Sequence, residues 1–384
     1  QVVPADKPLE IALRIKAKDG IGLEFDRPVT IMAGDDWVPL AVELDIEAGS
    51  ALDFSGFGQL DAPAGKHGWL QTTPEGTFAF ADDPTASKRF YGVNFCFTAH
   101  YIEHAEADRV AERLMRLGYN TVRFHHHESR LIDGKNGCST NLNPKSLDQL
   151  DYLFAALKKR GIYVTTDCYV SRPVYASEIW PGTEGRLEMN EFKMLVAVND
   201  KAFENWKTFV RNLMTHRNPY TEMSYADDPA LAWLSMINEA NFGNFIRGLS
   251  DRARPDWERA WGAWLKARHG AAEAVVKAWG KEFQGDLAKP IAKLAPSFTD
   301  DNRQSRDFAV FLAETERDMF LRMKAFLRNE IGTKAMLTNM NGWTNTPQSQ
   351  LARAEYDYVD DHFYVDHPQF LEKSWRLPSR CPNT

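Results

Sequence analysis

Several hallmarks of other protein classes are missing from this sequence of 384 residues. No stretch approaches the roughly 20 uninterrupted apolar residues that a membrane-spanning helix requires, so we expect a soluble chain. The net charge of -7 is spread along the sequence, without the basic stripe that marks nucleic-acid binding. The 4 cysteines show no metal-ligand spacing and need not be paired. We therefore expect neither a membrane nor a nucleic acid as partner, and no metal or other cofactor.

A recognisable targeting segment is also missing. The sequence begins with Gln1 instead of methionine, and no signal peptide is visible. We interpret the N-terminus as processed, trimmed or a fragment boundary. The compartment cannot be read from it directly, and the oligomeric state leaves no signal.

Hydrophobic and aromatic residues, by contrast, are plentiful. They make up 43% and 12% of the chain, and 11 residues are tryptophan. This length and composition fit one large domain with an accessory domain. Tryptophan and tyrosine in such numbers often fill a core, but they also form the flat platforms on which sugar rings stack.

The pattern of elements changes near residue 88. Residues 1–88 contain short alternating runs separated by Gly, Pro and Asp, which favours a small β-sandwich-like accessory domain. In residues 89–384, strands and helices alternate, and a helical insertion occupies about 245–300. The alternation predicts the α/β class with a parallel sheet. Six βα-type units favour a (β/α)8 TIM barrel whose C-terminal part is missing, with its chemistry at the carboxyl ends of the strands.

The run from Leu231 to Asn241 is the most informative part of the sequence. It is almost wholly apolar up to Ile237, which predicts a strand buried on both faces of a parallel sheet. The strand ends at Asn238, and Glu239 follows directly. Burial at the mouth of such a strand raises the pKa of a carboxyl, and a raised pKa suits a general acid that works near neutral pH.

Polar residues gather where each of the six predicted strands ends. Taken singly, such a residue is most often a cap or a packing residue. A barrel brings all of the strand ends into one pocket, so their agreement favours an active site. The residues are Asn94, Arg123 with His125, His126 and His127, Asp167, Asn238 with Glu239, Asn341 with Trp343, and His362 with Tyr364.

From about Tyr91 to Pro368 the chain resembles the clan A glycoside hydrolases, near family 5 (cellulases and mannanases) and related β-galactosidase-like families. The resemblance rests on four motifs at strand ends and on a tryptophan-rich insertion. These are Gly92-Val-Asn94, Leu117-Gly-Tyr-Asn-Thr-Val-Arg123, Asn238-Glu239, His362-Phe-Tyr364, and Trp261-x2-Trp264-Leu265 with Ala278-Trp279-Gly280.

The resemblance implies a retaining glycoside hydrolase that acts on β-linked poly- or oligosaccharides by double displacement. It makes Glu239 the acid/base, lets Asn238 bind the sugar 2-hydroxyl, and lets Arg123 support the nucleophile electrostatically. The substrate is then a carbohydrate, and the protein is expected to be secreted or periplasmic. The substrate-binding residues that we expect are Asn94, His126, His127, Asn341, His362, Tyr364 and, as a stacking platform, Trp343.

A second carboxylate is required, about 5–5.5 Å from the first in retaining enzymes. Clan A carries it at the end of strand seven, and too few residues follow Tyr364 for a seventh unit. The nearest carboxyls are interpreted as strand-flanking or loop residues: Glu355, Asp360, Asp361 and Asp366. We therefore expect a truncated chain, with the nucleophile beyond Thr384 and doubtful activity on its own.

Two other functions stay open on the sequence. The chain can be a non-catalytic relative that binds carbohydrate in the same cleft. Alternatively, a metal-dependent hydrolase can be built on His125, His127 and His362, with Asp167 as a further ligand. Glu128 and Asp167 can bind substrate or form ion pairs. The helical spacing of Trp257, Trp261 and Trp264 favours core packing over sugar binding.

Overall fold

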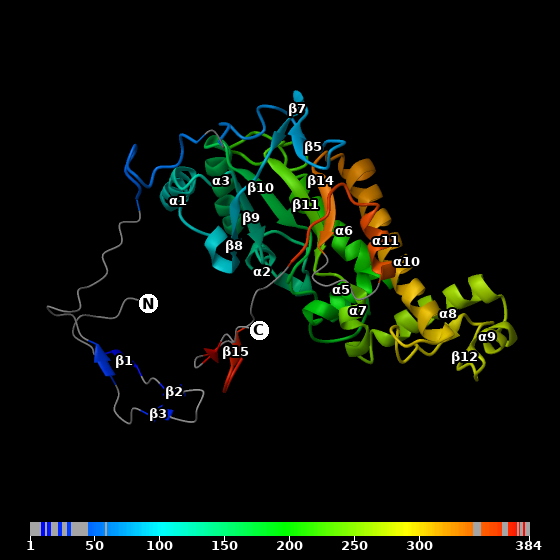
Figure 1. Cartoon of the computed structure of the whole chain (residues 1–384). Helices are drawn as coiled ribbons and strands as arrows, with labels where there is room; N and C mark the ends of the chain where they lie inside the picture. The colour runs from blue at the N-terminus through cyan, green and yellow to red at the C-terminus, as the bar shows by residue number, and fades with distance from the viewer. Residues whose placement is uncertain are drawn as a thin grey trace. The chain divides into compact units, whose positions relative to one another are not determined.

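The fold is described from a computed structural model (Figure 1), in which the chain divides into two compact units, Gln1–Ile46 and Glu47–Thr384. In the first unit, β1 (Leu9–Ile11) pairs antiparallel with β4 (Val29–Ile31), and β2 (Arg14–Lys16) with β3 (Gly22–Glu24). The residues that the structure describes are 9–11, 14–16, 22–24, 29–31, 45–57, 60–340, 347–362, 368–374, 376 and 379–380.

A third small sheet belongs to the second unit. It contains β5 (Leu70–Thr72), β6 (Phe78–Phe80) and β7 (Asp83–Lys88) in antiparallel order. Phe78 packs edge-on against Trp233, with ring centroids 5.7 Å apart, and Phe80 stacks on Tyr163 at 5.2 Å. This small sheet therefore packs against the main sheet that follows it. The β-sandwich predicted for residues 1–88 is not confirmed by the described strands.

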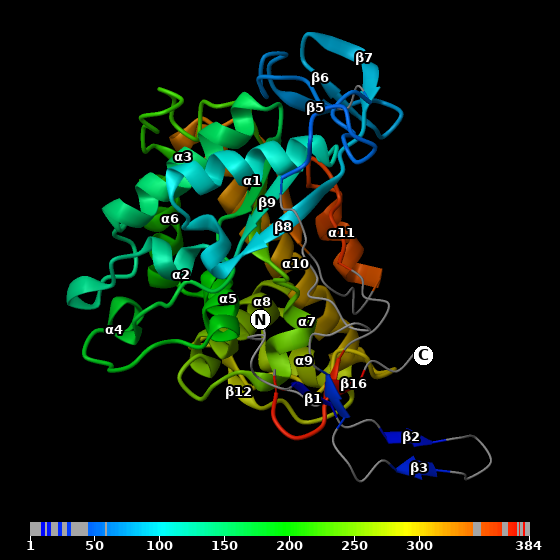
Figure 2. The ribbon, with the colours of Figure 1, turned by 90° about the vertical axis from the view of Figure 1, so that its left-hand side faces the viewer.

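The main sheet has five parallel strands in the order β14-β11-β10-β9-β8. This confirms the predicted α/β class with a parallel sheet, whose five strands are labelled in Figure 1 and of which Figure 2 shows β8 and β9 from another side. Residues 357–358 lie beside β14. The Asp357 N–H donates to the carbonyl oxygen of Leu337 at 2.9 Å. Closure into an eight-stranded barrel stays a prediction. The strands are β8 (Gly92–Cys96), β9 (Thr121–His125), β10 (Tyr163–Asp167), β11 (Leu231–Asn238) and β14 (Met336–Met340).

Helices connect the strands of this sheet, as expected for parallel order. The N-cap of α3 is Asn143, whose Oδ1 accepts from the backbone N–H groups of Lys145 and Ser146, both at 3.1 Å. The helices are α1 (His104–Arg116), α2 (Glu128–Leu131), α3 (Pro144–Lys159), α4 (Ala176–Ile179), α5 (Met189–Val198), α6 (Asp200–Met214), α7 (Phe242–Phe245), α8 (Arg254–His269), α9 (Ala272–Trp279), α10 (Arg303–Ala325) and α11 (Gln350–Arg353).

The remaining elements are short. Single turns of 3-10 helix lie at η1 (Phe97–His100), η2 (Lys135–Gly137), η3 (Ile246–Gly248) and η5 (Pro347–Ser349), and α10 continues into a π-helical turn, η4 (Phe326–Ile331). Two short antiparallel pairs complete the elements: β12 (Gly285–Asp286) with β13 (Ile291–Ala292), and β15 (Gln369–Phe370) with β16 (Ser379–Arg380).

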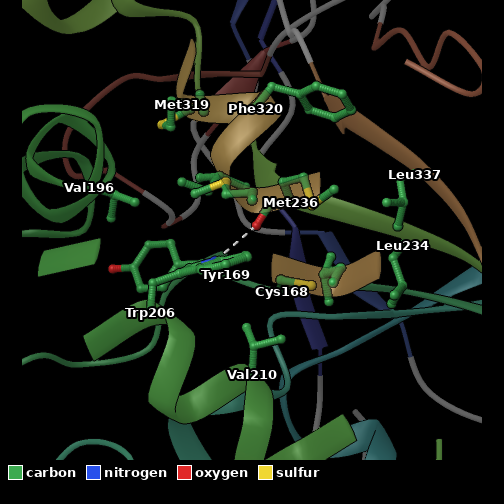
Figure 3. Packing of buried hydrophobic residues seen from close by; sticks show 14 of the residues in the cluster. Cys168, Tyr169, Val196, Trp206, Val210, Leu234, Met236, Met319, Phe320 and Leu337 are labelled. Atoms are coloured by element: carbon green, nitrogen blue, oxygen red, sulfur yellow. Dashed lines mark hydrogen bonds between the residues drawn. The ribbon is translucent and has the colours of Figure 1, made fainter. Parts of the chain in front are cut away.

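All eight residues of β11 are buried, as the sequence predicts for a strand covered on both faces. Figure 3 shows Leu234 and Met236 of this strand among Trp206 and Val210 of α6. The indole N–H of Trp206 donates to the Met236 carbonyl at 3.3 Å, so the largest side chain of this layer is also fixed in orientation. Leu234 and Met236 thus face the helices, and Trp233 and Ser235 face the opposite side of the sheet.

The tryptophan-rich insertion builds a second part of the core. Trp257 and Trp261 of α8 are fully buried, and the Trp261 ring stacks on Trp264 with centroids 5.2 Å apart. Trp264 donates its indole N–H to Glu314 of α10 at 2.6 Å. The interpretation of this series as core packing is confirmed.

A β-bulge interrupts the pairing of β11 with β14. Ser235 stands opposite Thr338, and the next pair is Asn238 opposite Met340, so β11 holds one extra residue. Since side chains alternate along a strand, the extra residue turns Asn238 onto the same face as Ser235. The Ile237 N–H, displaced from the ladder, donates instead to Oδ1 of buried Asn339 at 3.1 Å.

We expect Asn339→Ala to lower the free energy of unfolding by about 1–3 kcal/mol, because the buried Ile237 N–H loses its acceptor. Urea denaturation measures the loss, and hydrogen exchange of the Ile237 amide localises it. Asn199→Ala is the matched control, since it removes the N-cap of α6, where Oδ1 accepts from Lys201 and Ala202, and costs about 0.5–2 kcal/mol. Unchanged exchange of the Ile237 amide in Asn339→Ala contradicts the assigned role.

Candidate active site

Arg123 lies at the centre of the cluster formed by the carboxyl ends of three adjacent strands. One of its terminal nitrogens donates to Oδ1 and Oδ2 of Asp167, at 2.9 and 3.0 Å, and to Oδ1 of Asn238 at 2.8 Å. The three residues are 9%, 0% and 4% exposed, respectively. The contact with Asn238 depends on the bulge, which turns that amide toward the arginine. Three predicted site residues are thus brought together by β9, β10 and β11.

Asp167 also accepts a hydrogen bond from His125, whose Nδ1 lies 2.8 Å from Oδ2. Burial alone would raise the pKa of Asp167. The charge of Arg123 and the hydrogen bond from His125 outweigh it and lower the pKa to about 2. Asp167 is therefore ionised throughout the working range of an enzyme. With both oxygens occupied, it fixes Arg123 and His125 and does not face a ligand.

Glu239 follows the bulge in a left-handed backbone conformation, with φ of 50°, which is uncommon for a residue other than glycine. Its side chain is 26% exposed, and Oε1 lies 2.8 Å from Nδ1 of His362. The carboxyl is therefore accessible from solvent while its orientation is held by the imidazole. Strain of this kind at the end of a buried strand is typical of functional positions.

We expected burial to raise the pKa of Glu239, and this expectation is wrong. The hydrogen bond with His362 lowers the pKa and outweighs burial, which is only partial. The ionised carboxylate can only accept, so Nδ1 of His362 carries the hydrogen. His362 lies 123 positions from Glu239 in the sequence, so the apolar pattern of the strand alone gave the wrong direction for this pKa.

The three consecutive histidines have different environments. His126 has φ of 51°, contacts the Ser171 hydroxyl through Nδ1 at 2.7 Å and stacks on Phe97. Burial lowers its pKa to about 4. His127 is 1% exposed, and burial lowers its pKa to about 3. Both rings are therefore neutral near neutral pH. His127 lies in the core, and its substrate-binding role, like that of His126, stays a prediction.

The remaining predicted site residues are less well placed. Asn94 is exposed on β8, at one edge of the described sheet, opposite Arg123 in the register. Asn341, Trp343 and Tyr364 lie outside the described residues, so their substrate-binding roles stay predictions.

Two charged residues near the site were not expected from the sequence. Asp360, interpreted as a strand-flanking residue, has its pKa raised by burial and interacts electrostatically with His362 and Arg123. Lys193 of α5 is 1% exposed and interacts with Glu239. For Lys193, the sequence offers one signal: a lone lysine stands in the apolar run from Phe192 to Val196.

Among the described residues, no group of three or more His, Cys, Asp or Glu side chains is arranged to hold a metal ion. His125 and His362 are engaged with Asp167 and Glu239, so the histidine set of the metal-dependent alternative does not converge. No helix within the described part of the chain is long and apolar enough to cross a membrane.

Comparison with protein-family models gives no match, and no curated protein matches. A β-galactosidase from the psychrophilic Marinomonas ef1 is similar over 65% of this chain, at 19% identity and a TM-score of 0.46, and the chain spans 37% of its length. An endo-1,4-β-mannanase from Rhizomucor miehei is similar over 76% of this chain and 89% of its own, at 12% identity and a TM-score of 0.38. With TM-scores below 0.5, these likenesses establish neither fold nor function.

We expect Arg123→Met to lower the free energy of unfolding by about 3–5 kcal/mol, because buried Asp167 loses its arginine partner and keeps only the hydrogen bond from His125. The pKa of Asp167 is about 2 in the folded chain against 3.8 ordinarily. Its ionisation therefore stabilises the native fold above about pH 3.8, and this stabilisation is lost as the pH falls toward 2. In the variant the loss begins at higher pH. Urea denaturation across this range measures both effects.

Arg306→Met is the control for this experiment, because Arg306 forms an exposed ion pair with Asp301. Exposed pairs contribute about 0–1 kcal/mol, so this variant should unfold like the unmodified chain. Equal losses in the two variants contradict the central role of Arg123.

We expect His362→Gln to raise the pKa of Glu239 toward its ordinary value, since the hydrogen bond to His362 is the largest cause of the lowered pKa. NMR titration of labelled glutamate carboxyls measures this directly. His216→Gln is the matched control, because His216 pairs with Asp151 in the same way, at 2.7 Å, away from this site. If the Glu239 midpoint stays unchanged in His362→Gln, the assigned cause is wrong.

Proposed function

We propose that this chain provides the acid/base half of a retaining glycoside hydrolase that cleaves O-glycosidic bonds of β-linked poly- or oligosaccharides. One observation carries the proposal: Glu239 stands solvent-accessible at the carboxyl end of a buried parallel strand, oriented by His362, with Asn238 beside it. Completion of the sheet as a (β/α)8 barrel belongs to the same proposal. A polysaccharide substrate would make the protein secreted or periplasmic.

The proposed reaction has two steps. Glu239 gives its proton to the glycosidic oxygen as the bond from that oxygen to the anomeric carbon breaks, and a second carboxylate attacks that carbon to form a glycosyl-enzyme. Glu239, now ionised, takes a proton from water, which attacks the same carbon and releases the second carboxylate. In this proposal the Asn238 amide, whose Oδ1 accepts from Arg123, binds a sugar hydroxyl beside the reacting carbon.

Glu239 must be protonated for the first step, yet its pKa is lowered in the free chain. A sugar bound over the carboxyl removes water and disfavours the charged form, which raises the pKa. We therefore expect the first step to be favoured on the acidic side of neutrality.

The second carboxylate is not assigned to a described residue. Asp167 is hydrogen-bonded to Arg123 and His125. Asp360 interacts electrostatically with His362, Arg123 and Asp167. We propose that the nucleophile lies outside the described part of the chain. If the protein lacks it altogether, the same cleft binds carbohydrate without cleaving it, which is the second candidate function.

We expect Glu239→Gln in the full-length protein to reduce hydrolysis of glycans with poor leaving groups by about 10²–10⁴-fold. Aryl glycosides with activated leaving groups should lose far less in their first step, because they need little protonation. A panel of β-linked substrates that includes cellulose, mannan and β-galactosides supplies both kinds. Glu204→Gln is the control, since Glu204 is an exposed residue of α6.

Wild-type-like turnover of a natural glycan by Glu239→Gln contradicts the acid/base assignment. Binding of the same glycans by the unmodified full-length protein, without any turnover, supports the carbohydrate-binding alternative instead.

A further inference from the structure

A pocket of about 350 Å³ lies in the helical insertion that follows β11. Its walls come from η3, the start of α8, residues 294–298 and α10. Buried Ile246 and Phe308 supply apolar surface, and Arg247 of η3 and Arg254 of α8 supply charge. The volume lies within the range of small-molecule sites, about 300–1,000 Å³, and a mainly apolar wall with a few polar groups is typical of them.

The pocket lies on the same side of the sheet as the candidate site. The chain runs from Glu239 through α7 directly into Ile246 and Arg247, so one wall belongs to the connection that carries the proposed acid/base. α10 returns from the insertion to the start of β14 (Figure 1), so its first turns, with Phe308, lie toward the carboxyl ends of the strands. Ligands of parallel α/β sheets bind at this end.

Both arginines of the pocket are oriented by neutral groups. A terminal nitrogen of Arg254 donates to the carbonyl oxygen of Leu249 at 3.2 Å. The guanidinium of Arg247 lies over the ring of buried Phe298, 5.5 Å from its centroid. Within the described part of the chain, neither guanidinium forms an ion pair. A carbonyl and an aromatic ring fix the position of a guanidinium but leave its charge uncompensated.

The carboxylates of the surrounding elements do not supply the missing negative charge. No Asp or Glu among the described residues lines the pocket. Asp300 accepts from the Ser297 hydroxyl at 2.8 Å, and the other neighbouring carboxylates pair with different arginines. These pairs are Glu191 with Arg252, Asp256 with Arg259, Asp301 with Arg306, and Asp307 with Arg303.

We propose that this pocket is a subsite for the anionic group of an acidic saccharide, a carboxylate or a sulfate, which Arg247 and Arg254 bind. The planar fork of a guanidinium matches both groups through paired N–H···O bonds. Ile246 and Phe308 provide the apolar surface against which the sugar ring lies. That this saccharide is part of the substrate of Glu239 rests on the proposed function, whereas its binding does not.

We expect the full-length protein to bind a β-linked oligosaccharide that carries a glucuronic acid residue about 100-fold more tightly than the neutral oligosaccharide of the same length. Isothermal titration calorimetry measures both affinities. Added salt should reduce the preference, because it screens the charges. The same oligosaccharide with a sulfate in place of the carboxylate distinguishes the two anions, and the tighter ligand identifies the group that the pocket accepts.

Arg247→Gln and Arg254→Gln should each weaken binding of the acidic oligosaccharide about tenfold and leave the neutral affinity unchanged. Arg268→Gln is the matched control, because Arg268 also lies over an aromatic ring, that of Trp264 at 4.9 Å, but does not line the pocket. Where the protein hydrolyses the acidic oligosaccharide, Arg247→Gln should raise KM about tenfold without changing kcat, since this subsite does not contact the bond that breaks.

Equal affinity for acidic and neutral oligosaccharides, or an unchanged preference in both arginine variants, overturns the inference. Inorganic sulfate that binds as tightly as the sulfated oligosaccharide also overturns it, because the pocket then holds a free anion. Arg247 is exposed, so its replacement does not threaten the core. If Arg254→Gln does not fold, Arg247→Gln and the charge reversal Arg247→Glu decide the question.

The subsite and the proposed function fail in different ways. Arginine-dependent binding of the acidic oligosaccharide by a protein that cleaves no glycan supports the subsite and counts against the proposed function alone. Cleavage of neutral glycans that depends on Glu239, without any preference for acidic ones, supports the proposed function and overturns the subsite.

Discussion

The buried guanidinium of Arg123 is the constraint on which the candidate site depends. A cation that is 9% exposed must find acceptors, and it finds them on the next two strands of the sheet, at Asp167 of β10 and Asn238 of β11. These bonds fix the carboxyl ends of β9, β10 and β11 relative to one another. They also pair the negative charge of Asp167 with the positive charge of Arg123. This carboxylate therefore holds the strand ends together, and the reacting group must be another residue.

The position of Glu239 follows from that of Asn238. Without the extra residue in β11, Asn238 would face the helices and Arg123 would lose its third acceptor. The bulge in turn depends on Asn339, which accepts the displaced Ile237 N–H. Glu239 then leaves the strand in a left-handed conformation that brings its carboxyl to His362. A buried amide on β14 thus controls a carboxyl on β11 that it does not touch.

The sequence predicts the parts of this arrangement that are local. The apolar run that ends in Asn238 indicates a buried parallel strand, and the helix start at Asn143 follows from capping chemistry. The bulge is not predictable, because a slip of one residue leaves the apolar pattern of β11 unchanged when both of its faces are buried. Likewise, the burial of His127 and the contact of His362 with Glu239 depend on residues distant in sequence. The error over the pKa of Glu239 has this same origin.

The charges of the site also explain why Glu239, among the carboxyls described, is suited to respond to a ligand. Asp167 is held ionised by permanent partners, and Glu128 is fully buried, with its oxygens bound to the backbone N–H groups of Val170 and Ser171. Neither changes its surroundings when a ligand binds beside Glu239. Glu239 is partly exposed, and water shares its solvation with His362 and Lys193. A ligand that displaces this water disfavours the charged carboxylate, so binding and protonation are coupled at this carboxyl.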